Sequence, residues 1–279
     1  MTTLSAVPLA VQSPLPGLNE LVIGPSGSGK TTSIKTLIRA GITPFCIFTE
    51  PGFEVLGDVP PDQLKWHYIK PADQPWEAMV DAARKVNTFS LESLAKLPDI
   101  GKSKHNQFID LLTSLNDFVD DRTGEKFGDC CKWGTNRAIV IDSLSGVNIM
   151  AMGLVVGGKP VRSMSDWGIA MNVLENLIQK LCIDTRCHFI LMAHAEREVD
   201  QVLGGAKIMA STLGQKLAPK IPRFFSDVVL AQKNGSKYTW STVAAGADLK
   251  ARNYPDRDDL QPDFGPAVAE WKKRGGIIE

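Results

Sequence analysis

An eight-residue segment near the start of the chain constrains the fold more than any other feature. It reads Gly24, Pro25, Ser26, Gly27, Ser28, Gly29, Lys30, Thr31 and matches G-x-x-x-x-G-K-[ST] at every fixed position. Glycines let the backbone curl so that its N–H groups converge on a phosphate, and a following helix adds its positive end. An apolar strand at 20–23 and a helical run at 30–40 supply the required flanks. We therefore predict a phosphate-binding loop rather than a chance glycine turn.

The residues of this loop indicate a nucleoside triphosphate, ATP, held with Mg²⁺. Lys30 should reach the β- and γ-phosphates, and Thr31 should offer a hydroxyl ligand to the metal ion, with Thr32 completing the binding set. Asp142 ends the apolar segment RAIVID, where a carboxylate can hold the Mg²⁺ shell through water. The alternative for Asp142 is a helix N-cap, a role that Ser143 could fill equally well.

Hydrolysis also needs a group that orients or deprotonates the attacking water. Glu50, directly after the apolar segment PFCIFT, is the best candidate, although a loop carboxylate before Pro51 is the alternative. His194 ends the segment HFILMA, from which a polar side chain can sense the γ-phosphate. A histidine at a strand end is also often only a satisfied polar residue.

Short apolar segments alternate with segments of helical spacing along most of the chain. We expect strands at 20–23, 44–49, 66–69, 137–142, 188–193, 227–231, 238–243 and 248–251, and helices at 30–40, 76–86, 108–118 and from about 165 to 181. Residues 120–137 are polar and are expected to be looped. This alternation predicts an α/β fold with a mostly parallel central β-sheet flanked by helices on both faces.

The length of 279 residues permits one large domain or two small ones, and we favour one domain with appendages. We predict an extended N-terminal arm at 1–18, a core at 19–254 and a C-terminal tail at 255–279 with one short helix. Lys plus Arg (31) equal Asp plus Glu (31), so polyanion binding must be local or depend on assembly. The absence of a leader or a long apolar run predicts a soluble, cytoplasmic protein without membrane contact.

The five cysteines form no C-x-x-C pair, and their odd number argues against a disulfide framework. Cys130 and Cys131 are adjacent and could contribute to a metal site, but no matching Cys or His pair lies nearby in the sequence. We interpret them as ordinary thiols in a reducing compartment.

The order of motifs resembles the RecA-like P-loop NTPase core, and most closely the phage-type RecA-fold proteins of single-strand annealing and recombination (AAA-type phage nucleotide-binding proteins). The resemblance covers roughly 20–252 and is carried by GPSGSGKTT, FTEPG, AIVIDSLSG, DWGIAMNVLENLIQKL, FILMAHAERE and GGAKIMASTLGQKLAPKIPRFFSDVV. It implies that Glu50 is the catalytic base. It also implies that His194, where the family usually has an amide, couples nucleotide state to a DNA-binding loop.

The resemblance further implies DNA-contacting loops after two of the core strands. The corresponding stretches are 152–163, with Gly157, Gly158, Lys159 and Arg162, and 196–211, with Gly204, Gly205 and Lys207. Plain flexible loops are the alternative, because neither stretch holds an aromatic stacker.

RecA-like assemblies also complete the ATP site with a basic pair from a neighbouring subunit. Lys250 and Arg252 match that pair, and on one strand their side chains would project from the same face. A solvated strand face is the alternative.

The leading hypothesis is an ATP-hydrolysing homo-oligomer, a filament or ring with ATP at its subunit interfaces, that binds single-stranded DNA. A P-loop motor or loader in replication or packaging shares the same core. A small-molecule kinase is less favoured because the chain has no compact arginine cluster for a lid over the acceptor. In a non-catalytic protein, ATP would be only an assembly ligand, and Glu50 argues against that.

Overall fold

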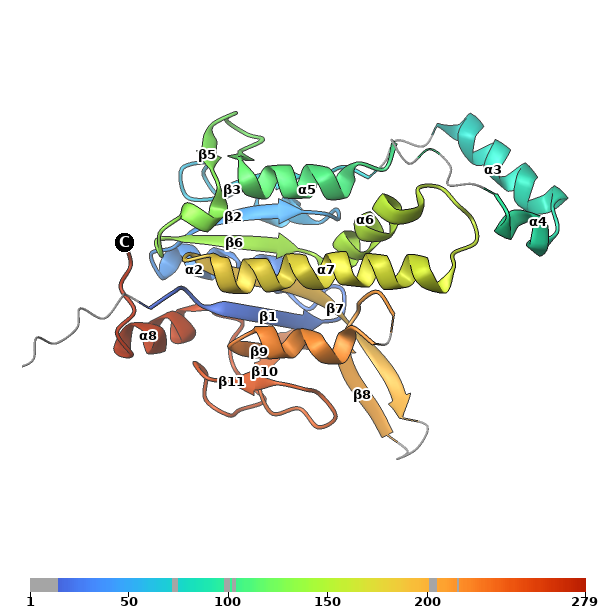
Figure 1. Ribbon diagram of the computed structural model, residues 1–279. Coiled ribbons are helices and arrows are strands. Elements are labelled where there is room, and N and C mark those ends of the chain that lie inside the picture. The colour runs from blue at the N-terminus through green and yellow to red at the C-terminus, as the bar shows by residue number, and fades with distance from the viewer. Residues whose placement is uncertain (1–14, 72–74, 98–100, 102–103, 201–204, 215) are drawn as a thin grey trace, which may run out of the picture.

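The computed structural model describes residues 15–71, 75–97, 101, 104–200, 205–214 and 216–279, and a β-sheet forms its centre (Figure 1). The hydrogen-bonded strand order is β10-β9-β1-β7-β6-β2-β3, with β8 paired to β7 and β11 to β9. The strands of the sheet are β1 (Asn19–Gly24), β2 (Thr43–Phe48), β3 (Lys65–Tyr68), β6 (Arg137–Asp142), β7 (His188–Asp200), β8 (Gly205–Ala210), β9 (Asp227–Asn234), β10 (Lys237–Ser241) and β11 (Lys250–Ala251). From β3 to β9 along this order each neighbouring pair is parallel, which confirms the predicted fold class.

Helices cover both faces of the sheet because each central strand is apolar on both sides. On β1, Leu21 and Ile23 join one hydrophobic core and Val22 joins the other, as a two-residue period requires. The first core packs under α5 (Gln107–Asn116), α6 (Leu144–Val156) and α7 (Met164–Asp184), and the second under α2 (Lys35–Arg39) and α8 (Gly265–Lys273). Figure 1 shows α5 and α7 running across the same face of the sheet.

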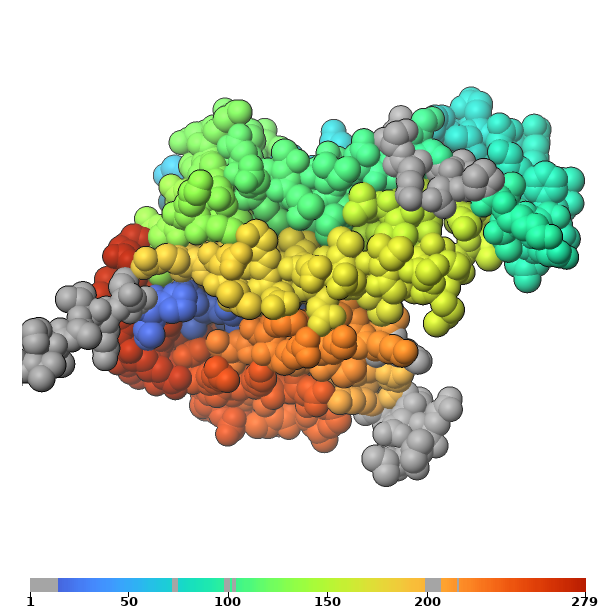
Figure 2. Space-filling view, viewed as in Figure 1, coloured from blue at the N-terminus to red at the C-terminus, as the bar shows by residue number. Residues whose placement is uncertain are grey.

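The segment after β3 leaves the sheet and forms α3 (Trp76–Thr88) and α4 (Leu91–Ala95). These two helices project beyond the edge of the molecule at which the strands end, and no residue of α3 is buried (Figures 1 and 2). The helix expected at 76–86 is therefore present, but it contributes nothing to the core.

Three segments that were expected to be loops contain regular structure. Residues 120–137 contain β5 (Lys126–Gly128), which pairs with β4 (Phe118–Val119), and the 3-10 turn η3 (Cys130–Lys132). Their polar residues are satisfied locally, since buried Asp120 accepts hydrogen bonds from Trp66 N and Thr123 Oγ1. The first expected DNA loop, 152–163, begins inside α6, which the sequence analysis missed. In the second, 196–211, the described residues 196–200 and 205–210 are antiparallel partners on β7 and β8 rather than loop.

The C-terminal segment packs on the sheet. Phe264, Ala267, Val268 and Trp271 are buried in the second core, so the short helix expected after 255 is present as α8. Trp271 Nε1 donates to Pro16 O at 2.8 Å and thereby links α8 to the segment that precedes β1. Most of the predicted arm, 1–14, lies outside the described residues. No helix in the described part of the chain has the length and apolarity needed to cross a bilayer.

His188 begins β7 beneath this C-terminal packing. Leu18 N donates to its Nδ1 at 3.0 Å, and its ring meets the Trp271 ring edge-on with centroids 5.0 Å apart. Burial lowers the pKa of His188 to about 4. The imidazole is therefore neutral in the folded protein at neutral pH and acts as a hydrogen-bond acceptor.

This environment predicts an acid-sensitive contribution to stability. An unfolded histidine titrates near about 6.5, so between that pH and about 4 the unfolded chain binds more protons than the folded one. Stability is therefore lost as the pH falls through this window, by about 3 kcal/mol at its lower end. His188→Gln, which keeps an acceptor but cannot titrate, should remove that part of the pH dependence in urea denaturation at pH 7 to 4. Parallel pH profiles for both proteins would contradict the assignment.

Candidate functional site

The glycine-rich segment forms a closed loop between β1 and the short helix α1 (Lys30–Ser33). Gly27 and Gly29 have φ of 71° and 84°, a conformation that residues with a Cβ rarely adopt. A Cβ on Gly24 would lie 2.5 Å from Ala231 O on β9, so only glycine allows this approach. Ser28 Oγ donates to Pro25 O at 2.8 Å and fastens the loop. The sequence therefore builds the predicted phosphate-binding turn.

The Lys30 ammonium lies over this loop. Its Nζ donates to Gly24 O and to Pro25 O, both at 2.9 Å, and the residue is buried. Burial lowers the pKa of Lys30, while the Asp142 and Glu50 carboxylates act in the opposite direction. Phosphate oxygens placed on the loop would offer this ammonium charged acceptors in exchange for neutral ones, which form stronger hydrogen bonds.

Thr31 and Asp142 face each other across the end of the loop. Thr31 Oγ1 donates to Asp142 Oδ2 at 2.6 Å, so Asp142 does not serve as a helix cap. Ser143 occupies the N-cap position of α6, but its hydroxyl makes no capping bond. Burial raises the pKa of Asp142, and the Thr31 hydroxyl and Lys30 ammonium oppose that rise. A hydroxyl and a carboxylate at this spacing are oxygen ligands of the kind that Mg²⁺ takes, so these residues fit the implied metal ion.

Thr49, which the sequence analysis did not single out, fixes the two strand ends that carry the carboxylates. Its Oγ1 accepts from Ser143 N at 2.9 Å and donates to Ser143 O at 2.8 Å. A Cβ on Gly146 would lie 2.2 Å from the same Oγ1, so Gly146 leaves room for Thr49. In the sequence, only the position of Thr49 between an apolar strand and Glu50 pointed to a role at this site.

Glu50 and His194 form a pair above the strand that ends in Asp142. Glu50 Oε2 and His194 Nε2 are 3.1 Å apart, and each side chain is 33% exposed. Glu50 follows β2 and His194 lies on β7, with β6 between them in the sheet. The structure thus brings together the two residues that the sequence analysis proposed for hydrolysis and sensing.

Lys30, the Thr31–Asp142 pair and the Glu50–His194 pair line one cavity of about 1130 Å³. Its lining includes the loop residues 26–33 together with Glu50, Asp142 and His194. Tyr238 on β10, also missed by the sequence analysis, places its ring against the loop, since a Cβ on Gly29 would be 3.0 Å from Tyr238 Cδ1. The cavity continues along α2 toward Asp58, which forms an ion pair with Lys35 at 2.6 Å.

The predicted basic pair lies at the end of the strands opposite the phosphate loop. Lys250 pairs with Val228, near the start of β9, and its Nζ donates to Pro222 O at 2.8 Å and Phe225 O at 3.2 Å. Burial lowers the pKa of Lys250. β11 ends at Ala251, so strand alternation does not place Arg252 on the face of Lys250, contrary to expectation. Neither residue lines the cavity of its own chain.

The β7–β8 hairpin is hydrogen-bonded at its base to the His194 backbone. Ser211 N donates to His194 O at 2.7 Å, and Ser211 Oγ donates to Glu196 Oε1 at 2.8 Å. Asn148 on α6 donates to Ser211 O at 3.0 Å. Farther along the hairpin, Lys207 forms an ion pair with Asp248 at 2.7 Å, and Gly204 lies outside the described residues.

The stretch between α6 and α7 is the other predicted DNA-contacting segment. It holds exposed Arg162, whose guanidinium carbon lies 5.6 Å from the centre of the Trp167 ring at the start of α7. An aromatic ring therefore lies beside this stretch, just past the boundary that the sequence analysis gave it.

Comparison with known proteins agrees with this geometry. A family model described as an AAA domain matches residues 17–245, which is most of the chain. No curated protein matches the chain. The chain therefore belongs to this AAA-domain family, and it is a P-loop, nucleotide-binding ATPase of the AAA type.

The site predicts separable roles for Lys30 and Asp142 in nucleotide affinity. Lys30→Ala should weaken binding of a fluorescent ATP analogue with or without Mg²⁺, by about 10- to 100-fold for a charged hydrogen bond. Asp142→Asn keeps a partner for Thr31 but removes the charge, so it should lose only the gain in affinity that Mg²⁺ gives. Asp58→Asn, a carboxylate of the same cavity, is the control and should keep that gain. An unchanged Mg²⁺ effect in Asp142→Asn would remove its metal role.

Proposed function

We propose that the chain hydrolyses ATP in a Mg²⁺-dependent reaction, with Glu50 as the base. The observation that carries this proposal is the convergence of Lys30, the Thr31–Asp142 pair and the Glu50–His194 pair on one cavity. Such a set supplies phosphate binding, metal ligation and proton acceptance at neighbouring strand ends.

Each residue has a distinct task in this reaction. The loop N–H groups and the Lys30 ammonium stabilise negative charge on the phosphates. Mg²⁺, bound through Thr31 and Asp142, would neutralise charge on the β- and γ-phosphate oxygens. Glu50 accepts a proton from the attacking water, and His194 orients the Glu50 carboxylate through Nε2. Thr49 keeps Glu50 and Asp142 in register.

The base assignment predicts a rate effect without a binding effect. Glu50→Gln preserves size and one hydrogen-bond acceptor but cannot take a proton, so turnover should fall by about 10²- to 10⁴-fold. Affinity for ATP should change little. Glu54→Gln, exposed on the 3-10 turn η1 (Phe53–Leu56), is the matched control and should hydrolyse ATP at the wild-type rate. Turnover of Glu50→Gln at the wild-type rate would disprove the assignment. If the wild type itself turned over slowly and Glu50→Gln did not change that rate, ATP would be favoured as an assembly ligand.

We further propose that the ATPase acts as a homo-oligomer on single-stranded DNA, in phage-type recombination or annealing. Two features support the DNA role. His194 and the hairpin belong to one continuous strand, and Arg162 beside Trp167 can pair a cation with a stacking surface. Assembly is supported by the position of Arg252 at the edge opposite the loop, because only another subunit could bring it to a nucleotide.

These proposals predict that ATP turnover rises with protein concentration and with single-stranded DNA. In Arg252→Ala, turnover should be reduced at assembling concentrations. This variant is cleaner than Lys250→Ala, because Lys250 also donates two hydrogen bonds within its own chain. Lys126→Ala, which removes an exposed charge on β5, is the control.

Mixing two inactive variants tests the shared site directly. An Arg252→Ala subunit keeps its base, and a Glu50→Gln subunit keeps its arginine, so a mixture should regain turnover at the interfaces that combine them. If mixing restored no turnover, an Arg252 side chain supplied by a neighbouring subunit would be ruled out. If turnover changed neither with single-stranded DNA nor with protein concentration, the DNA-coupled assembly would be ruled out, and the proposal of ATP hydrolysis would still stand.

A further inference from the structure

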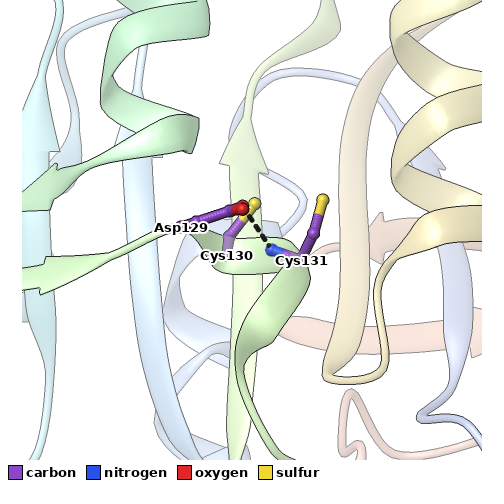
Figure 3. A group of neighbouring side chains, drawn as sticks. All are labelled: Asp129, Cys130 and Cys131. Atoms are coloured by element: carbon purple, nitrogen blue, oxygen red, sulfur yellow. Dashed lines mark hydrogen bonds between the residues drawn. The ribbon is translucent and has the colours of Figure 1, made fainter.

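A second group of side chains with metal-binding chemistry lies on the turn η3, between β5 and β6. Asp129, Cys130 and Cys131 each offer one possible ligand atom, and these atoms all lie within 4.8 Å of one another. Figure 3 shows the Asp129 carboxylate beside the Cys130 sulfur, with the Cys131 sulfur set apart from them. Sequence spacing alone gave no matching pair for the two cysteines. The fold supplies the third ligand from the residue that caps the turn.

Hydrogen bonds and core packing hold the three residues of the turn in this arrangement. Asp129 Oδ1 accepts a hydrogen bond from Cys131 N at 2.9 Å, which fixes the carboxylate beside the thiols. The Cys130 side chain is buried in the first core, and Cys187 Sγ, directly before β7, donates to Cys130 O at 3.6 Å. The backbone of the site is therefore anchored to the central sheet.

The outer side of the group is open to solvent. Cys131 and Asp129 are partly exposed, and Asp129 Oδ2 forms an ion pair with Lys132 Nζ at 3.7 Å, whose side chain is 82% exposed. An exposed ion pair of this kind contributes little, so an incoming ion displaces it at small cost. An ion can therefore approach from the side of Asp129 and Cys131, while the buried Cys130 forms the inner side of the group.

We propose that Asp129, Cys130 and Cys131 bind a thiophilic divalent ion of the Zn²⁺ type, with solvent at the remaining position. Two thiolates and a carboxylate are ligands that Zn²⁺ takes in proteins, whereas Mg²⁺ prefers oxygen alone. The site differs from the Thr31–Asp142 site in both place and chemistry.

The ion would have a structural role. The turn lies before the first residue of β6 and Asp142 is the last, so the full strand separates the two sites, roughly 20 Å at the usual rise per residue. A bound ion would cross-link the turn on the far side of the aromatic cluster of Phe45, Phe118 and Trp133. It should therefore stabilise the fold and leave ATP turnover unchanged.

Cd²⁺ titration of the full-length protein tests the proposal, because cadmium–thiolate bonds absorb in the ultraviolet and oxygen-bound Cd²⁺ does not. The titration is run with a phosphine reductant and excess Mg²⁺, so that the thiols stay reduced and the nucleotide site is occupied. Wild-type protein should bind one ion per chain with this absorbance. Zn²⁺ should compete for the same site and raise the melting temperature.

The variants separate this site from the other thiols. Cys131→Ser replaces a partly exposed thiol, so folding should survive, and it should lose the one-ion absorbance step and the Zn²⁺-induced rise in melting temperature. Asp129→Asn should weaken binding by at least about tenfold. Cys182→Ser, on α7, removes a partly buried thiol outside the group and should titrate like wild type. Absence of the absorbance in the wild type, or identical titrations of wild type and Cys131→Ser, would overturn the proposal.

Discussion

The parallel register of four adjacent strands is the constraint on which the rest of the structure depends. β1, β7, β6 and β2 are aligned so that Gly24 pairs with His194 and Asp142 pairs with both Met192 and Phe48. A slip of one residue would turn every side chain of a strand to the opposite face and move buried apolar residues out of their core. The two hydrophobic cores thus hold the register, and the register places the phosphate loop, the proposed metal ligands and the proposed base at the same end of the strands.

Charge balance within the cavity follows from that placement. Lys30, Asp142, Glu50 and His194 share a region in which burial lowers the pKa of Lys30 and raises that of Asp142. Lys30 and the two carboxylates each favour the charged form of the other, whereas Glu50 disfavours the charged form of Asp142. Removing Lys30 would therefore leave the carboxylates uncompensated. The two loop carbonyls that hold the Lys30 ammonium keep it satisfied until charged oxygens replace them. The site is therefore arranged for a polyanion and a cation together.

The sequence predicted the parts of this site that depend on local pattern. Apolar segments such as 138–141 gave the core strands, and the glycine-rich motif gave the loop. Helix α6 was missed because it is apolar on nearly every side, with residues such as Leu144, Val147 and Ala151 buried, so it shows no helical period. The hairpin was missed because β7 runs beyond the sheet at Glu196 and Arg197, where polar residues resemble a loop.

Contacts that depend on strand order could not be predicted. The Glu50–His194 pair requires β2 and β7 to flank β6, and Tyr238 reaches Gly29 only because β10 lies beyond β9. Asp129, Cys130 and Cys131 are consecutive in the sequence, but the relative directions of their side chains depend on the turn that the Asp129 cap fixes. For the contacts between strands, the residues are visible in the sequence, but their proximity is a property of the assembled sheet.

The root of the β7–β8 hairpin joins the two strand ends that carry His194 and Asp142. Ser211 is bonded to the His194 carbonyl and the Glu196 carboxylate, and it also accepts from Asn148 on α6, the helix that begins directly after Asp142 and Ser143. A change at the γ-phosphate position that moves either strand end must therefore deform these bonds or move the hairpin with it. The hydrogen bonds of Ser211 and Asn148 therefore connect the proposed γ-phosphate side of the cavity to the start of the hairpin through both strand ends.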